Sequence, residues 1–135
     1  MPLNVNLLRQ SFEVVATANP RFVSRFYEIL FERHPPARAL FPQNGMARQA
    51  EMLTQALVAV LDHLEDAPWL VDTLGALGAK HVGYGVTREM YDWVGTSLLA
   101  TLAEVAGPAW TPELQAAWAE AYGAIVSLML ARAGT

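Results

Sequence analysis

The sequence contains no cysteine. Without thiols the chain can form neither a disulfide framework nor a thiolate site for zinc or an iron–sulfur cluster. Histidine and carboxylate groups therefore remain as the possible metal ligands. The lack of cysteine is also typical of proteins from a reducing compartment, so we expect a cytoplasmic location.

Long apolar runs and clusters of basic residues are missing as well. The longest apolar stretches, ALVAVL and AIVSLML, are far shorter than the ~20 residues that cross a bilayer, and the N-terminus MPLNVNLLRQ has no basic region followed by a hydrophobic one. The formal charge is −4 and the Arg and Lys residues are scattered singly, which leaves no basic stripe for phosphates. We expect no membrane span, no secretion signal and no nucleic-acid partner.

Strand patterns, internal repeats and low-complexity tracts are absent, and helical spacing dominates instead. Apolar residues make up 53% of the 135 residues and charged residues 16%, so apolar surface is available to line a cavity or a cofactor. We expect one all-α domain, residues 1–135, with six or seven helices. Mixed helix lengths favour pairwise crossed packing over a uniform four-helix bundle.

Prolines, glycines and capping residues predict where the helices begin and end. Asn19 as a cap and Pro20 at the first helical position start a second helix near residue 20, and the prolines of HPP end it. A long helix is expected over 46–63, followed by a shorter, loosely held helix over 69–81 with interior glycines. Two more helices start after the capping residues Thr87 and Thr111.

Three histidines are candidates for metal ligation. His34 precedes two prolines at a helix end, where a surface cap or a positive charge near the end of the helix dipole suits it. His63 lies near the end of another helix and is most simply a half-exposed residue. His81 differs, because GAKHVGYGV places it on a weak helix just before glycines that let another helix or a flat ligand approach the backbone. A buried, hydrogen-bonded core histidine remains the alternative at this position.

Further candidates lie on three other segments. RFYEILF places Tyr27 on the second helix, and RALF places Phe41 at a corner between short helices. RQAEML places Gln49 four residues before Leu53 on one helix face. Structural alternatives remain open: a core tyrosine bonded to a backbone carbonyl, an exposed glutamine, and ordinary core packing for Phe41 and Leu53.

The chain resembles the globin family in four stretches: FYEILFERHPPARALF, LGAKHVGYGV, MYDWVGTSLLATLAEVAG and AWAEAYGAI. Within that family it is similar to bacterial single-domain haemoglobins and to the globin part of flavohaemoglobins. The resemblance covers nearly the whole length. It implies a globin fold of six to eight helices around a haem pocket, with haem b as the cofactor.

The resemblance also implies roles for individual residues. His81 would be the proximal ligand of the haem iron, and Tyr27 and Gln49 would form the distal polar pair. Phe41 would be wedged against the haem, and Leu53 would form the apolar wall of the distal pocket. Neutral imidazole is a good iron ligand, while hydroxyl and amide groups can hydrogen-bond a diatomic gas inside a dry pocket.

Four more residues are assigned to the cofactor pocket or its rim by the resemblance. Tyr91 would lie near the proximal histidine, and Val94 on the same helix would contact the cofactor. Lys80 and Arg48 would each pair with a haem propionate, although a solvated side chain is the alternative for both.

The proximal side departs from the pattern of the related flavohaemoglobins. Those relatives place a glutamate late in the last helix, which polarises the proximal histidine together with a tyrosine. Ala133 stands at that position here, so peroxidase-like chemistry loses support. The second ring nitrogen of His81 is then expected to bond a backbone carbonyl near Leu77, or Tyr91.

Two functional hypotheses follow. The first is a haem protein that reversibly binds dioxygen, and also NO and CO, at pentacoordinate iron, as a monomer or homodimer. Because the sequence contains no flavin or nicotinamide module, nitric oxide dioxygenase turnover would need a separate flavin- or NAD(P)H-dependent reductase. The second is a haem-based or haem-free globin-fold sensor or protein-interaction module. Its haem-free form predicts His81 packed against another helix, with Tyr27 and Gln49 facing different directions.

Overall fold

The computed structural model describes residues 4–41 and 44–133, and within them every regular element is helical. The helices, in chain order, are α1 (Val5–Ala18), α2 (Phe22–Arg33), the 3-10 helix η1 (Pro35–Leu40), α3 (Met46–Asp62), α4 (Ala67–Gly83), α5 (Arg88–Ala106), the 3-10 helix η2 (Gly107–Ala109) and α6 (Pro112–Ala133). The all-α prediction is confirmed.

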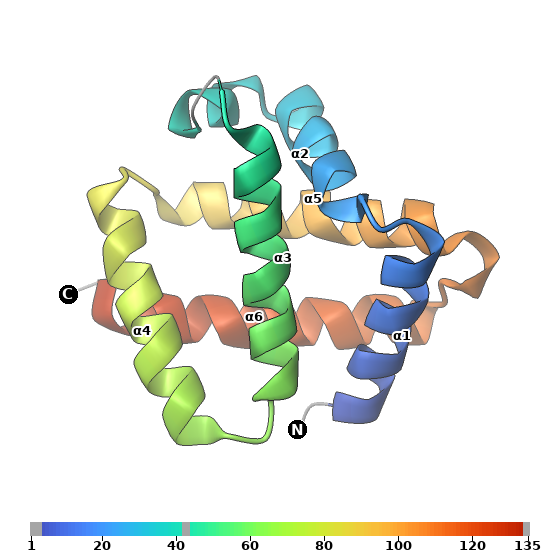
Figure 1. Ribbon diagram of the computed structural model, residues 1–135. Coiled ribbons are helices and arrows are strands. Elements are labelled where there is room, and N and C mark those ends of the chain that lie inside the picture. The colour runs from blue at the N-terminus through green and yellow to red at the C-terminus, as the bar shows by residue number, and fades with distance from the viewer. Residues whose placement is uncertain (1–3, 42–43, 134–135) are drawn as a thin grey trace.

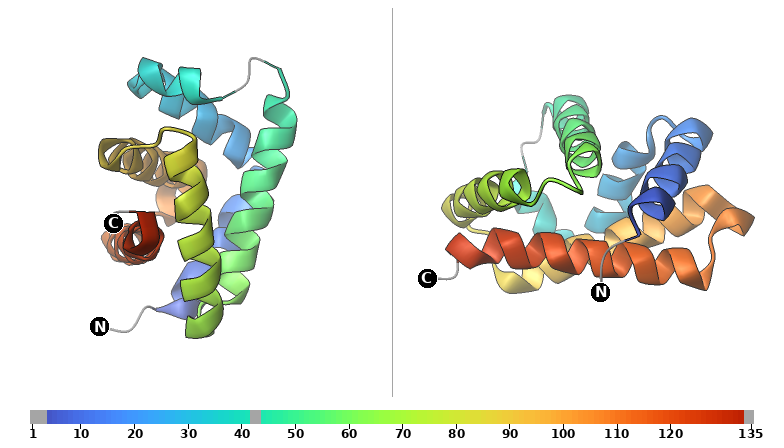
Figure 2. Two further views of the ribbon diagram at one scale, coloured as in Figure 1. Left: turned by 90° about the vertical axis from the view of Figure 1, so that its left-hand side faces the viewer. Right: turned by 90° about the horizontal axis from the view of Figure 1, so that it is seen from below.

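The helices form two layers. α5 and α6 run across the molecule one above the other, and α3 crosses in front of them (Figure 1). Viewed from the side, α3 and α4 lie on one face of the α5–α6 pair (Figure 2). α4 rests on α6, whereas α2 rests on α5 and also contacts α3. The helices therefore pack in crossed pairs, as their mixed lengths predict.

Local capping residues explain several helix ends. The Thr111 hydroxyl accepts a hydrogen bond from the Leu114 amide at 3.1 Å and starts α6 as predicted. The Asn19 side chain instead accepts from the Arg21 amide at 2.9 Å, within a turn that contains Pro20. Since this turn comes first, α2 begins at Phe22, slightly after the predicted start near residue 20.

The prediction of a shorter, loosely held helix for α4 was wrong both in its length and in its packing. α4 has 17 residues, as many as α3, because the Asp66 side chain accepts from the Trp69 amide at 3.2 Å and extends its start. Gly78 is buried, and a Cβ added there would overlap the Met129 carbonyl of α6. The glycine that weakens the helix in isolation is thus the place where α4 packs closest against α6.

The core consists of two apolar clusters. The first cluster is built from α1, α2, α3, α5 and the first half of α6, with Phe22 and Leu102 among its best-buried members. The second cluster is smaller and centres on Leu74, Tyr91 and Met129, from α4, α5 and α6. α5 and α6 contribute to both clusters, so these two helices connect them.

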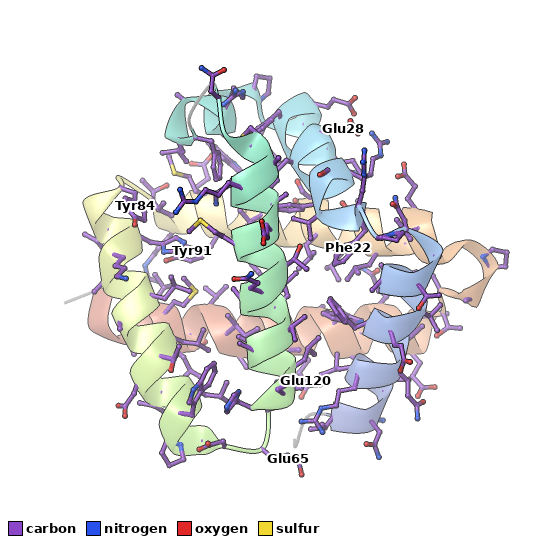
Figure 3. All side chains as sticks on the ribbon, in the orientation of Figure 1. Phe22, Glu28, Glu65, Tyr84, Tyr91 and Glu120 are labelled. Atoms are coloured by element: carbon purple, nitrogen blue, oxygen red, sulfur yellow. The ribbon has the colours of Figure 1, made fainter. Side chains whose placement is uncertain are left out.

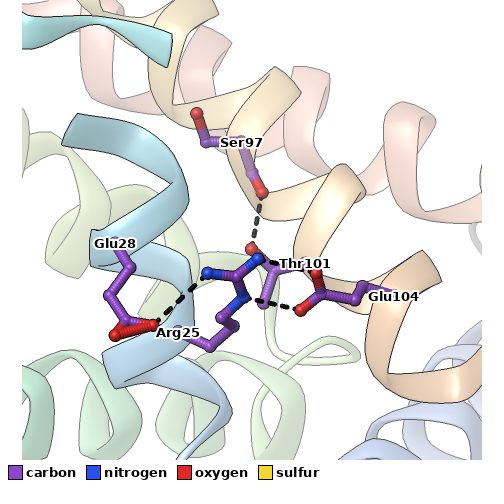
Figure 4. Close-up of polar contacts among 5 residues, drawn as sticks. All are labelled: Arg25, Glu28, Ser97, Thr101 and Glu104. Atoms are coloured by element: carbon purple, nitrogen blue, oxygen red, sulfur yellow. Dashed lines mark hydrogen bonds and ion pairs between the residues drawn. The ribbon is translucent and has the colours of Figure 1, made fainter. Parts of the chain in front are cut away.

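Polar contacts tie α2 to α5 at the edge of the first cluster (Figure 4). Arg25 Nε donates to Glu104 Oε2 at 2.7 Å and Arg25 Nη2 donates to Glu104 Oε1 at 2.8 Å. These bonds hold the pKa of the Glu104 carboxyl below its usual range. Beneath the pair, the Thr101 hydroxyl donates to the Ser97 carbonyl at 2.7 Å. The paired guanidinium and carboxylate fix one crossing of the fold.

Among the described residues, one helix is long and apolar enough to cross a membrane by length and composition alone. The window Pro112–Ala131 of α6 has a mean hydropathy of 1.2, although Glu113 and Glu120 lie within it. A helix that is apolar on all sides occurs in protein cores as well as in bilayers. In this fold α6 packs against α4, α5 and α1.

Candidate functional site

α3 ends and α4 begins at a shared turn, and the two helices diverge from it (Figure 1). At the turn, the His63 ring stacks on the Trp69 ring with centroids 4.0 Å apart and planes 10° apart. His63 Nδ1 also lies 2.7 Å from the Ala59 carbonyl. His63 is therefore part of the turn that joins the two helices, and it is partly exposed, as expected for it.

His81 lies near the end of α4, half-buried, with one ring nitrogen engaged. His81 Nδ1 is 2.8 Å from the Leu77 carbonyl, which confirms the backbone alternative for its partner. The ring of His81 also stacks against the ring of Tyr91, with centroids 6.3 Å apart and planes 25° apart. His81 Nε2 makes no hydrogen bond within the described residues. With Nδ1 as the N–H donor to the carbonyl, Nε2 carries the lone pair that can ligate a metal.

Tyr91 is buried in the first turn of α5. Figure 3 places Tyr91 and Tyr84 beside the upper half of α4. Tyr91 is 7% exposed, whereas Tyr84 is 65% exposed. Burial raises the pKa of the Tyr91 hydroxyl. The Tyr91 backbone carbonyl accepts a 2.6 Å hydrogen bond from the Tyr122 hydroxyl of α6, and burial likewise raises the pKa of Tyr122.

Tyr27 and Gln49 lie together, on α2 and α3. Gln49 Nε2 donates to the Tyr27 hydroxyl oxygen at 3.2 Å. This bond excludes the exposed-glutamine alternative, and it gives Tyr27 a side-chain partner instead of a backbone carbonyl. Burial raises the pKa of Tyr27, although the bond from Gln49 acts in the opposite direction. The neutral tyrosine therefore keeps its O–H as a donor that a small ligand can use.

Phe41 contacts Tyr27 of this pair, and Leu53 lies one helical turn after Gln49 on α3. Phe41 follows the end of η1, and its ring lies edge-on to Tyr27 with centroids 5.2 Å apart. Arg38 Nη1 donates to the Phe41 carbonyl at 3.2 Å and fixes the backbone there. Leu53 is half-buried against the first cluster. Val94, on α5, packs against the same cluster.

The remaining sequence candidates lie at the surface or serve the fold. Lys80 and Arg48 are exposed. His34 stacks on Trp93 with centroids 5.2 Å apart, so it links the end of α2 to α5. Ala133 ends α6, and its side chain lies outside the described part of the structure.

The glycines near His81 differ in their surroundings. Gly78 packs against α6, where an added Cβ would overlap the Met129 carbonyl. A Cβ added at Gly83 would meet no atom of the described residues within 4 Å, so no other helix approaches the backbone there. Gly85 has φ +85° and makes the turn between α4 and α5, a conformation that favours glycine.

The candidate site spans the boundary between the two clusters. Tyr27, Phe41 and Leu53 belong to the first cluster, whereas Tyr91 and Leu77 belong to the second. Among the described residues no group of three or more His, Cys, Asp or Glu side chains could hold a metal ion. A metal at His81 would therefore depend on a cofactor that supplies its other ligands.

Sequence reasoning missed Tyr122, which binds the Tyr91 backbone from a different helix. AWAEAYGAI gives no local signal for this role, because the partner lies 31 residues earlier in the chain. Only an expected neighbour relation between α5 and α6 could have pointed to it.

Comparisons with known proteins agree with the helical fold. A family model described as Globin matches residues 24–129. The flavohemoprotein of Rhodopirellula baltica is 32% identical over 132 residues, which is 96% of this chain and 32% of that protein. The flavohemoprotein of Bordetella pertussis is 34% identical over 128 residues, 93% of this chain and 32% of that protein. The chain thus spans about a third of the length of these relatives.

Two solved structures have the same fold. A bacterial globin from Campylobacter jejuni matches with a TM-score of 0.82 and 20% identity, over 96% of this chain and 94% of that one. An engineered carbene transferase from Rhodothermus marinus, described as a candidate nitric oxide dioxygenase, matches with a TM-score of 0.83 and 28% identity, over 96% and 90% of the two chains.

Proposed function

Because this chain belongs to the globin family, we propose that it binds haem b between its two apolar clusters and uses it to bind dioxygen and other diatomic gases reversibly. In this proposal His81 would hold the cofactor through its iron. Tyr27 and Gln49 would supply polar groups to a bound gas, and Phe41, Leu53 and Val94 would contact the cofactor. Lys80 and Arg48 provide the positive charge for its carboxylates.

The groups around His81 fit a haem. The Leu77 carbonyl, 2.8 Å from Nδ1, holds the imidazole in the tautomer that leaves Nε2 as the ligand. When bound, a haem with one histidine ligand supplies an iron with an open position for a diatomic gas. A neutral carbonyl partner makes the imidazole less anionic than a carboxylate partner does. This feature supports gas binding over cleavage of an O–O bond.

The hydrogen bond between Gln49 and Tyr27 is the observation that carries the gas-binding proposal. It brings two polar groups from different helices together in an apolar setting at 3.2 Å. The Gln49 amide orients the tyrosine, so that the Tyr27 O–H can donate to a gas ligand with partial negative charge. A hydrogen bond is stronger there than in water. The haem-free alternative expects the two residues to face different directions, and their contact disagrees with it.

Nitric oxide dioxygenation is the finer part of the proposal. The relatives named flavohemoprotein and the Rhodothermus marinus protein support it. Its turnover needs electrons, for which we propose a separate flavin- or NAD(P)H-dependent reductase as partner. Nitric oxide consumption by the purified protein, measured with and without NADH and a flavin reductase, tests this part. Consumption that does not respond to the reductase would contradict it.

The absorption spectrum tests cofactor binding. The purified protein, or the protein reconstituted with hemin, should have a strong Soret band that shifts when carbon monoxide is added to the reduced form. A colourless protein that takes up no hemin would overturn the proposal.

His81→Ala should lose most of its bound haem, because the only side-chain bond to the iron is removed. Haem content is measured from the pyridine haemochrome spectrum. His63→Ala is the matched control, since His63 is also a half-buried histidine near a helix end but lies at the turn between α3 and α4. An unchanged ferrous spectrum of His81→Ala would place the ligand elsewhere.

Tyr27→Phe should release dioxygen roughly tenfold faster, because one hydrogen bond to a partly charged ligand is lost. Carbon monoxide, a weaker acceptor, should be affected less. Stopped-flow dissociation rates measure both gases, with the exposed Tyr84→Phe as control. Equal changes for the two gases would mean that Tyr27 acts by shape alone.

Location and assembly complete the proposal. We propose a cytoplasmic protein that is a monomer or a homodimer. Cell fractionation and analytical ultracentrifugation test these two points.

A further inference from the structure

One asparagine of the chain lies where its side chain can react with the main chain. Asn44 and Gly45 come directly before α3, and both are exposed. We propose that Asn44 is a site of spontaneous deamidation, and that the isoaspartate formed there loosens the contact between Gln49 and Tyr27. The modification is a property of the chain alone, whereas its effect on gas binding rests on the function proposed above.

The reaction needs only these two residues and water. The Gly45 amide nitrogen attacks the side-chain carbonyl carbon of Asn44, the bond from that carbon to the side-chain nitrogen breaks, and ammonia leaves with the proton of the Gly45 amide. Water then opens the resulting imide ring. Opening at one carbonyl leaves aspartate, and opening at the other leaves isoaspartate, in which the main chain runs through Cβ and Cγ of residue 44.

The surroundings of Gly45 allow the ring to close. Gly45 has φ +87°, and a Cβ added there would meet no atom within 4 Å among the described residues. Within the same part of the chain, neither the Asn44 side chain nor the Gly45 amide nitrogen has a hydrogen-bond partner. Glycine also carries no side chain that would hinder approach to its nitrogen. The two reacting groups can therefore meet.

The other three asparagines of the sequence, Asn4, Asn6 and Asn19, lack these conditions. Asn19 precedes Pro20, whose nitrogen carries no proton to lose. The Asn4 side chain accepts a hydrogen bond from the Leu7 amide at 3.1 Å. This amide is also the nitrogen that would have to attack Asn6. A comparison within one chain thus separates the reactivity of Asn44 from that of asparagine in general.

The position of Asn44 connects the modification to the candidate site. Gly45 is the N-cap residue of α3, and its carbonyl accepts a 3.0 Å hydrogen bond from the Gln49 backbone amide. The Gln49 side chain in turn donates to the Tyr27 hydroxyl at 3.2 Å. Isoaspartate lengthens the main chain by one methylene group directly before Gly45, so it displaces the start of α3 that holds Gln49.

The two products should differ in their effects, although both add a negative charge beside the N-terminus of α3. α3 has no side-chain cap and no acidic residue in its first turn, and a carboxylate near a helix N-terminus is favourable. Aspartate keeps the length of the main chain, so it should leave the contact of Gln49 with Tyr27 in place. Isoaspartate should disturb this contact.

Incubation of the purified full chain at mildly alkaline pH tests the modification. Trypsin cleavage after Arg38 and Arg48 places Asn44 in the peptide of residues 39–48. Mass spectrometry detects the replacement of its amide by a carboxyl group, and a protein isoaspartate methyltransferase labels isoaspartate. We expect both signals in this peptide, increasing with pH because the attacking nitrogen must lose its proton. An unmodified Asn44, or modification of Asn6 at the same rate, would overturn the proposal.

Asn44→Gln is the matched control, because it keeps a neutral amide but has to close a larger ring. Asn44→Asp reproduces the aspartate product. Stopped flow measures dioxygen dissociation from the two variants and from wild type, before and after incubation. We expect incubated wild type to gain a phase that releases dioxygen about two- to fivefold faster, with fresh Asn44→Asp and incubated Asn44→Gln unchanged.

Isoaspartate at residue 44 without the faster phase would overturn the link to Gln49 and Tyr27. The same phase in incubated Asn44→Gln would also overturn this link, because it would arise from another change in the protein. A wild-type protein that takes up no haem would instead contradict the proposed function. In that case the peptide analysis still decides whether Asn44 is modified.

Discussion

Two hydroxyl groups in the middle of α5 are completely buried but differ in their partners. Ser97 and Thr101 are both 0% exposed. Thr101 donates to the Ser97 carbonyl, whereas Ser97 Oγ has no hydrogen-bond partner among the described residues. An unpaired buried hydroxyl costs free energy, since it has lost its bonds to water.

Ser97→Ala should therefore raise the free energy of unfolding by about 1 kcal/mol. Thr101→Val removes a bond that is made and should lower it by a similar amount, about 1 kcal/mol. Urea unfolding of the haem-free proteins measures both. A loss of stability in Ser97→Ala would indicate that its hydroxyl has a bonding partner, such as a buried water.

At the scale of the helices, the packing of α4 on α6 depends on Gly78. Gly78→Ala should destabilise the protein by about 1–3 kcal/mol, because the new Cβ overlaps the Met129 carbonyl and forces the helices apart. Gly83→Ala, in the last turn of the same helix with open space around it, should be neutral or stabilising by up to about 1 kcal/mol. Thermal unfolding compares the two variants. Equal losses of stability in the two variants would show that the effect arises within helix α4 and not from its packing on α6.

The helices themselves were largely predictable from the sequence, because their ends are set by local chemistry. Thr111 caps α6 with its own hydroxyl, and the HPP prolines end α2 near Arg33. The close packing of α4 on α6 was not predictable in the same way. Its glycines are unfavourable in an isolated helix, and the value of Gly78 comes from Met129, which lies far along the chain.

At the scale of the whole molecule, two buried tyrosines and one partly buried tyrosine couple stability to alkaline pH. Burial raises the pKa of Tyr27, Tyr91 and Tyr122 in the folded state. Their contribution to the free energy of unfolding is fully present below the tyrosine pKa of the unfolded chain, about 10. It is lost as the pH rises toward the higher pKa values of the folded state, because the tyrosines of the unfolded chain ionise first.

Stability to urea should therefore fall between about pH 9 and 11. The stability of Tyr122→Phe should fall less steeply over this range, because this variant lacks the tyrosine whose pKa is raised strongly by burial. Tyr84→Phe, at an exposed position, should keep the slope of the unmodified protein. Identical slopes in all three proteins would contradict the prediction.

The two halves of the site differed in how far the sequence revealed them. Each proposed role came from the family resemblance, while the contact of Tyr27 with Gln49 required α2 and α3 to cross at the right register. The bond of His81 to Leu77 was foreseeable, because the two residues lie one helical turn apart. The support from Tyr122 was not, since it depends on how α6 lies against α5.

The contact of Gly78 with Met129 also determines the order in which parts of the fold can form during synthesis. α6 is synthesised after α1 to α5, and at roughly 5–20 residues per second the delay between Gly78 and Met129 lasts a few seconds. α2 and α5 can already pair during that interval, but the glycine face of α4 has no partner. The half of the molecule that carries His81 is thus the last to be completed as the nascent chain leaves the ribosome.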